Sequence, residues 1–141
     1  MTPSADRANG SAMIDVRPVG YVVGLLLVVL GMTMLLPLGM DVYAGNGHWP
    51  VFLESSVLTV MAGVCLSLAC ANSVSRGLSI RQIFLVTTSV WLALPFFGAI
   101  PFVLGAPNAS YTDAFFEAMS GLTTTGASVF GHINEMPEGI L

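Results

Sequence analysis

Residues Tyr111 to Phe130, YTDAFFEAMSGLTTTGASVF, decide the fold, because this segment has the features of neither a loop nor a membrane-spanning helix. Asp113 to Ser120 has the pattern of a short amphipathic helix, and Gly121 stands where a helix C-cap is expected. A helix from Tyr111 to Gly121 would be about 16 Å long, roughly half a bilayer. Such a helix can enter a membrane but cannot cross it.

The residues that follow, Leu122 to Ser128 (LTTTGAS), are expected to leave the helix. Non-helical backbone is tolerated at membrane depth only where it is buried in protein or lines a wet cavity. The C-terminus of the half-helix carries about half a negative charge, which compensates a cation for its lost water. The carbonyl oxygens of Thr123, Thr124 and Thr125 can replace the hydration shell, and Gly126 can adopt positive φ without strain. The chemistry predicted is that of a cation filter.

Two acidic residues lie four apart on one face of the expected half-helix. Asp113 has a simple explanation, since an acid in the first turn of a helix is stabilised by the macrodipole. Glu117 lies one turn deeper, where a carboxylate at membrane depth indicates a function. It would either brace the filter by accepting backbone N–H bonds or face the outer vestibule. The alternative for the whole segment is an ordinary extracellular loop, rich in Thr and Gly, after a short buried helix.

The fourteen residues Phe115 to Ser128, FFEAMSGLTTTGAS, resemble the first pore helix and filter of the TrkH/KtrB family of bacterial potassium uptake proteins. This resemblance implies an all-α membrane protein, made of transmembrane helices with a re-entrant half-helix and pore loop. It implies that K⁺ is bound at Thr124, Thr125 and Gly126, with Thr123 also in the filter. Residues expected to support the filter are Glu117, Gly121, Leu122 and Ala127.

The resemblance carries further expectations about the assembly. The family has four repeats of helix, pore loop and helix, so the chain would stop at Leu141 before the second helix of its first repeat. A homodimer and a cytosolic nucleotide-binding regulatory subunit are implied as partners, in the bacterial inner membrane. No cofactor is expected apart from the transported K⁺, with Na⁺ as a second candidate ion.

Composition independently favours a membrane protein. Only 9% of the residues are charged while 55% are hydrophobic, which leaves too few charges to cover a soluble surface. The net charge of −4, with four Lys and Arg in all, excludes a nucleic-acid-binding surface. The lipid bilayer is therefore the expected environment.

Three apolar segments are long enough to cross about 30 Å of hydrocarbon. They are Val19 to Met40, Val51 to Ala71 and Ile83 to Gly105, and the third is expected to bend or end early at Pro95 and Pro101. The first is longer than the apolar core of a signal peptide. The chain thus divides into a cytoplasmic tail (1–15), two leading transmembrane helices (19–71), and a first helix, pore helix and filter loop of repeat 1 (80–141).

The second span contains small residues suited to close helix packing. They are Ser55, Ser56, Thr59, Gly63 and Ser67. Cys65 and Cys70 are five apart and so lie on roughly opposite helix faces. They are expected to pack rather than to form a disulfide or metal pair.

The distribution of basic residues predicts the orientation. Arg17, Arg76 and Arg81 flank the spans on one side, whereas Asp41 to Pro50 form a loop without Lys or Arg. The positive-inside bias places the N-terminus in the cytoplasm. The half-helix would then enter from outside. His48 and His132 are expected in external segments without a metal-binding role.

The sequence thus favours a pore-forming subunit that conducts K⁺ through a backbone-carbonyl filter. A secondary transporter with broken helices is the first alternative, because half-helices also build midplane sites in such proteins. An intramembrane enzyme would need a nucleophile and base, or two acids, at membrane depth, and no histidine or aspartate is expected inside a span. We therefore expect no enzymatic activity. A purely structural membrane subunit is the remaining alternative.

Overall fold

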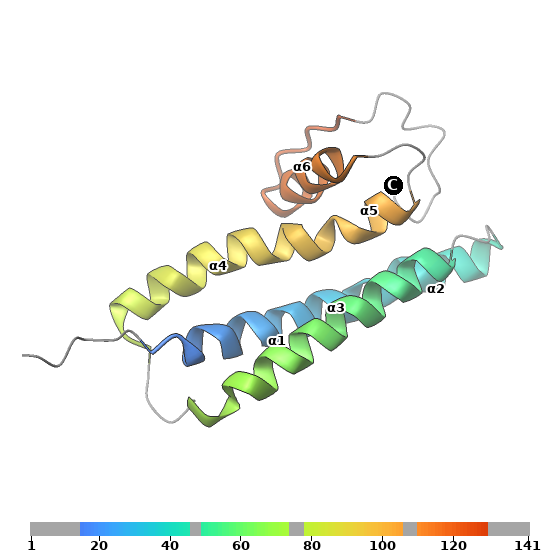
Figure 1. Cartoon of the computed structure of the whole chain (residues 1–141). Coiled ribbons are helices and arrows are strands. Elements are labelled where there is room, and N and C mark those ends of the chain that lie inside the picture. Colours follow the sequence, from blue (N-terminus) through green and yellow to red (C-terminus); the bar gives the residue numbers. More distant parts are fainter. Residues whose placement is uncertain (1–14, 46–48, 74–77, 106–109, 130–141) are drawn as a thin grey trace, which may run out of the picture.

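A computed structural model describes residues 15–45, 49–73, 78–105 and 110–129 (Figure 1). All regular secondary structure in these ranges is helical. The elements are α1 (Arg17–Thr33), α2 (Leu35–Ala44), α3 (Trp49–Cys70), the short 3₁₀ helix η1 (Ala71–Ser73), α4 (Ile80–Gly98), α5 (Ile100–Gly105) and α6 (Tyr111–Leu122).

Three helical runs in the described ranges are long and apolar enough to span a membrane. They are Arg17–Tyr43 with 27 residues, Trp49–Cys70 with 22 and Ile80–Gly105 with 26. The first combines α1 with most of α2, and the third combines α4 with α5. The helix α6 is too short to belong to this group, as the sequence predicts.

Prolines explain why two of these runs are interrupted. The run α1–α2 breaks at Met34, and Pro37 has no N–H to donate to the carbonyl of Thr33. The run α4–α5 breaks at Ala99, two residues before Pro101. Pro95, by contrast, lies inside the continuous helix α4. The helix is therefore interrupted near the end of the third span, where a bend or an early end is expected, and the interruption lies nearer to Pro101.

One expectation about the first span is wrong. The sequence places Asp41 in the loop after Met40 and expects no aspartate in a span, but α2 continues to Ala44 and buries Asp41 at 1% exposure. The helix ends instead where Gly45 adopts φ of +70°, a conformation that glycine reaches without strain. A single charge is a weaker stop signal than this glycine.

The helices α1 and α3 form an antiparallel hairpin in which the two backbones nearly touch. A Cβ atom on Gly63 would lie 2.7 Å from the carbonyl oxygen of Gly24 and 2.8 Å from the amide nitrogen of Val28. A Cβ on Gly24 would meet the backbone of α3 at similarly short distances. Only glycine fits at this crossing, which is the packing mode of small residues in membrane helices.

Buried hydroxyl groups add a directional contact to the same hairpin. Ser56 is 3% exposed and donates a hydrogen bond of 2.7 Å to the carbonyl oxygen of Gly31 in α1. Ser55 and Thr59 are fully buried beside it, and each donates to a carbonyl of its own helix. The small polar residues expected to pack in the second span do so.

Replacing Ser56 by alanine is expected to destabilise the hairpin by about 1 kcal/mol, because the carbonyl of Gly31 loses its buried donor. The unfolding free energy in detergent micelles measures this change. Thr88→Ala is the matched control, since Thr88 is exposed and donates only to Phe84 of its own helix. Equal stability of the two variants would show that the interhelical bond contributes nothing.

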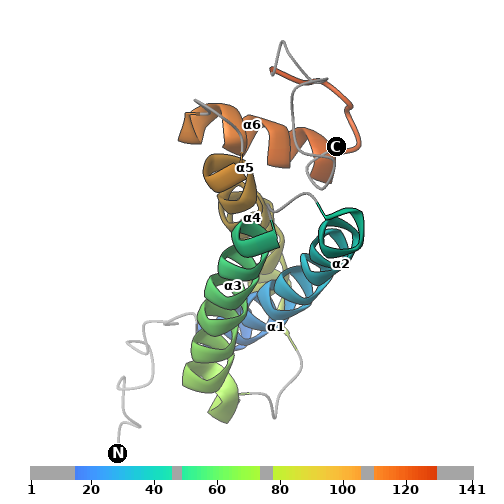
Figure 2. The same cartoon turned by 90° about the vertical axis from the view of Figure 1, so that its right-hand side faces the viewer.

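The third run lies against the hairpin and carries α6 at its far end (Figures 1 and 2). The core comprises Val19, Val23 and Leu27 of α1, packed against partly buried residues of α4 that include Val86, Val90 and Leu94. The turn that ends α2 lies at the same end of the molecule as α5 and α6, whereas α1 and α4 begin at the opposite end.

Candidate functional site

The start of α6 is fixed by its N-cap. The Ser110 hydroxyl accepts a hydrogen bond of 3.2 Å from the Asp113 amide and donates one of 2.7 Å to the Asp113 carboxylate. Tyr111 donates its hydroxyl to the carbonyl oxygen of Phe96 at 3.1 Å, and the two rings meet edge to face. Burial raises the pKa of the Tyr111 phenol, so the group stays protonated as a donor. Asp113 therefore acts at the helix N-terminus, as its simpler explanation predicts.

The helix α6 folds back along the end of the third run. Ala114 is fully buried, and a Cβ on Gly98 would lie 3.5 Å from that of Ala118. With 12 residues α6 is about 18 Å long. Figure 1 shows residues 123–129 running back along α6, toward the end at which this helix begins.

The end of α6 is a Schellman motif, and it lies later than the sequence predicts. The amide of Thr125 donates to the carbonyl of Ser120 at 3.0 Å, and the amide of Thr124 donates to that of Gly121 at 3.1 Å. The C-cap is Thr123, and Gly121 is inside the helix without positive φ. The expectation that Gly121 caps the helix is therefore wrong. The motif instead places Thr124 at the left-handed position.

Two residues of the turn adopt left-handed backbone angles. Thr124 has φ of +55° and Gly126 has φ of +71°. In the described ranges Thr124 is the one non-glycine residue with positive φ, and its β-branched side chain makes that conformation costly, by about 1–2 kcal/mol. Gly126 adopts its left-handed angle without such a cost, as expected from the sequence. The left-handed angle at Thr124 follows from its place in the Schellman motif.

Threonine hydroxyl groups tie the turn to the helix. The Thr123 hydroxyl donates to the carbonyl of Met119 at 2.9 Å and lies 2.7 Å from the Thr125 hydroxyl. These contacts compensate part of the strain at Thr124. The hydroxyl groups of Thr123 and Thr125 are thus both hydrogen-bonded within the turn and the last turn of α6.

Glu117 connects α6 to the returning chain. Its carboxylate accepts a hydrogen bond of 3.3 Å from the amide of Val129, twelve residues later. Of the two arrangements considered for Glu117, this is the bracing one. The bond closes a loop around the segment from Leu122 to Ser128.

All residues from Gly121 to Val129 are exposed on the surface of the described chain, including Leu122 and Ala127. Gly121 and Leu122 form the last residues of α6, positions 123–126 form the turn directly after it, and Glu117 is half-buried one turn earlier in the helix.

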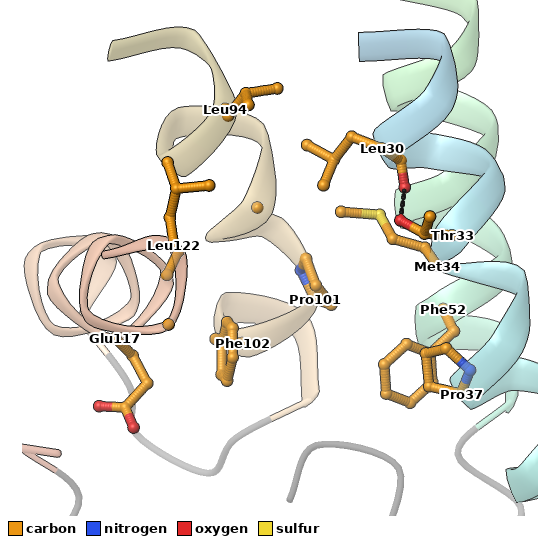
Figure 3. A pocket seen from close by; sticks show the side chains of 13 residues that line it. Leu30, Thr33, Met34, Pro37, Phe52, Leu94, Pro101, Phe102, Glu117 and Leu122 are labelled. Atoms are coloured by element: carbon orange, nitrogen blue, oxygen red, sulfur yellow. Dashed lines mark hydrogen bonds between the residues drawn. The ribbon is translucent and has the colours of Figure 1, made fainter. Parts of the chain in front are cut away.

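A cavity of about 350 Å³ separates α6 from the hairpin (Figure 3). Most of its lining is apolar, and Glu117 is its one ionisable side chain. Figure 3 shows the Glu117 carboxylate turned away from Leu30 and Met34 on the opposite wall. The lining includes Leu30, Met34, Pro37, Phe52, Leu94, Pro101, Phe102, Glu117 and Leu122. Sequence patterns do not predict this space, because it arises where the three long helical runs and α6 meet.

Within the described ranges, no group of three His, Cys, Asp or Glu side chains is arranged to hold a metal ion. His48, His132 and the acidic residues after 130 lie outside those ranges. So do Arg76 and nearly all of the expected tail (1–15).

Comparisons with known proteins agree with this architecture. No family model matches the chain. The chain is 36% identical over 129 residues to the Trk system potassium uptake protein TrkH of Halomonas elongata, and 34% identical over 127 residues to TrkH of Escherichia coli K12. These alignments cover 91% and 89% of the chain, but 27% and 26% of the relatives, so the chain spans about a quarter of their length.

The structural comparison points the same way. The crystal structure of the potassium transporter TrkH from Vibrio parahaemolyticus matches with a TM-score of 0.83 and 33% sequence identity, covering 90% of this chain and 27% of that one. The match extends over the leading hairpin as well as the pore-helix region. The chain therefore belongs to the TrkH/KtrB family of membrane proteins.

Proposed function

We propose that this chain forms part of the pore of a potassium uptake system, and that the turn after α6 is one quarter of its ion filter. The observation that carries this proposal is the end of α6: a helix of half-bilayer length terminates in a strained, non-helical turn that its own threonines and Glu117 hold in place. A merely connecting loop does not need a β-branched residue with left-handed φ.

The proposed ligands are main-chain carbonyl oxygens of residues Thr123 to Gly126, with K⁺ bound at Thr124, Thr125 and Gly126. The hydroxyls of Thr123 and Thr125 are engaged with Met119 and with each other, which favours the backbone as the ion's ligand. The negative end of the α6 dipole faces this turn and stabilises a partly dehydrated cation. We infer that Glu117 keeps the returning chain in register.

The identity of the ion and the partners rest on the family. The relatives are named as potassium uptake proteins, which supports K⁺ as the ion. We propose that three equivalent loops complete the filter, and that the protein is a homodimer gated by a cytosolic nucleotide-binding subunit. The proposed location is the bacterial inner membrane, with the N-terminus in the cytoplasm and α6 entering from outside. Arg17 and Arg81, at the starts of α1 and α4, support this orientation.

Gly126→Ser is expected to weaken the preference for K⁺ over Na⁺ several-fold, because a side chain at φ of +71° strains the backbone by about 1 kcal/mol or more. The measurement is the ratio of K⁺ to Na⁺ uptake into vesicles that contain the full protein. Gly39→Ser is the control, since Gly39 lies in α2 with open space around it. Unchanged selectivity in Gly126→Ser would remove this glycine from the filter. Coupled, slowly saturating uptake would instead indicate a secondary transporter.

A further inference from the structure

Asp41 is a buried carboxylate that takes no part in the proposed filter. It lies in the last turn of α2 with 1% of its surface exposed, and neither carboxylate oxygen has a hydrogen-bond partner. Leaving a buried polar group unpaired is costly, and the cost is larger for a charge. Such a group in a native structure requires an explanation, and a bound water or ion is one of those that a buried carboxylate permits.

A second cavity adjoins this carboxylate. Its volume is about 460 Å³, and it is lined by Asp41, Val42, Gly45 and Trp49, where α2 ends and α3 begins. It is separate from the cavity beside Glu117, with which it shares no lining residue. The space accommodates an ion together with water molecules that complete its coordination.

The charges around the cavity favour a cation. The basic side chains in the described part of the chain are Arg17 and Arg81, which lie in the first turns of α1 and α4, at the opposite end of the molecule (Figure 1). Along the helix, Arg17 is about 36 Å from Asp41 at 1.5 Å per residue. Neither arginine can neutralise Asp41.

The end of α2 adds further negative potential. No basic residue lies in its last turn, and its final carbonyls carry the negative end of the helix dipole. The indole of Trp49 also lines the cavity and can face a cation. Asp41 is the one carboxylate among the described lining residues, and its single charge balances that of a monovalent cation. Ca²⁺ would take six to eight oxygen ligands.

We propose that Asp41 and the carbonyl end of α2 form a second binding site for a monovalent alkali cation, distinct from the turn after α6. The end of α2, which carries this site, lies toward the same end of the molecule as α5 and α6 (Figure 1). It would hold an ion on the leading hairpin, outside the conduction path.

Trp49 provides a direct readout of this site. This chain has two tryptophans, Trp49 and Trp91. Trp91→Phe, together with Phe at every tryptophan elsewhere in the full protein, leaves Trp49 as the sole reporter. The full protein carrying these changes is titrated in detergent with KCl against choline chloride at constant ionic strength. We expect a saturable change in Trp49 emission with K⁺. Absence of any such change in this background overturns the proposal, whatever the substitutions at Asp41 do.

Asp41→Asn in the same background is expected to abolish the saturable change, and Asp41→Glu to retain it with altered half-saturation. Glu54→Gln is the matched control, because Glu54 is an exposed carboxylate near the start of α3, and it is expected to titrate like its parent. A K⁺ response that survives in Asp41→Asn overturns the assignment. A response to Ca²⁺ but not to K⁺ also overturns the proposal. So does Trp49 emission that changes with no cation, as expected if a basic side chain occupies the site.

Discussion

Gly63→Ala is expected to destabilise the leading hairpin by about 1–3 kcal/mol, a fall of roughly 5- to 150-fold in the folding equilibrium constant. The added methyl would lie 2.7 Å from one backbone atom of α1 and 2.8 Å from another. Backbone cannot rotate away as a side chain can, so the helices must separate along the crossing. Unfolding of the purified protein in micelles with increasing denaturing detergent measures the loss.

Gly39→Ala is the matched control for this substitution. Gly39 also lies in a helix, but no atom lies within 4 Å of a Cβ placed there. Alanine is expected to be neutral or to stabilise α2 by up to about 1 kcal/mol, because its helix propensity is higher. If Gly63→Ala proved as stable as Gly39→Ala, the close approach of α1 and α3 would be disproved.

Glu117→Leu is expected to lower K⁺ uptake more than tenfold. The substitution removes the acceptor for the Val129 amide, and a hydrogen bond to a charged group contributes about 1.5–3 kcal/mol. At about 1.4 kcal/mol per factor of ten, losing the closed filter geometry reduces the competent population by one to two orders of magnitude. Initial rates of uptake into vesicles containing the full protein provide the measurement.

Two further variants separate the causes. Glu117→Gln keeps an acceptor oxygen in the same place and is expected to retain more uptake than Glu117→Leu. Asp113→Asn changes a carboxylate one turn earlier, whose partner is Ser110 rather than the returning chain, and is expected to behave almost as the parent. Uptake by Glu117→Leu at the parental rate would exclude the bracing role.

Sequence patterns predict the large features of this molecule because those features follow from long apolar runs. The three spans and the short α6 need only length and composition. The glycine and serine side of α3 is also predictable, since small residues recur along one helix face. The pattern does not reveal which residue of α1 each small residue of α3 contacts. The contact between Gly63 and Gly24 depends on how two helices that are separate in the sequence cross.

The errors have local physical causes. Asp41 was expected to end the first span because a charge is costly in lipid, but the left-handed Gly45 decides the helix end. Gly121 was expected to cap α6, yet the Schellman bonds put the left-handed position at Thr124. A usable signal was present elsewhere: the Ser79 and Gln82 spacing forms a capping box that starts α4 three residues before the expected position.

The turn after α6 takes its shape from bonds within a single stretch, Met119 to Val129 together with Glu117. Its geometry is consequently encoded in sequence neighbours. During synthesis, this turn can adopt its contour as soon as it leaves the ribosome and insertion machinery, without waiting for distant parts of the protein. If the proposed filter is built from four such turns, each can enter the assembly with its backbone shape already set.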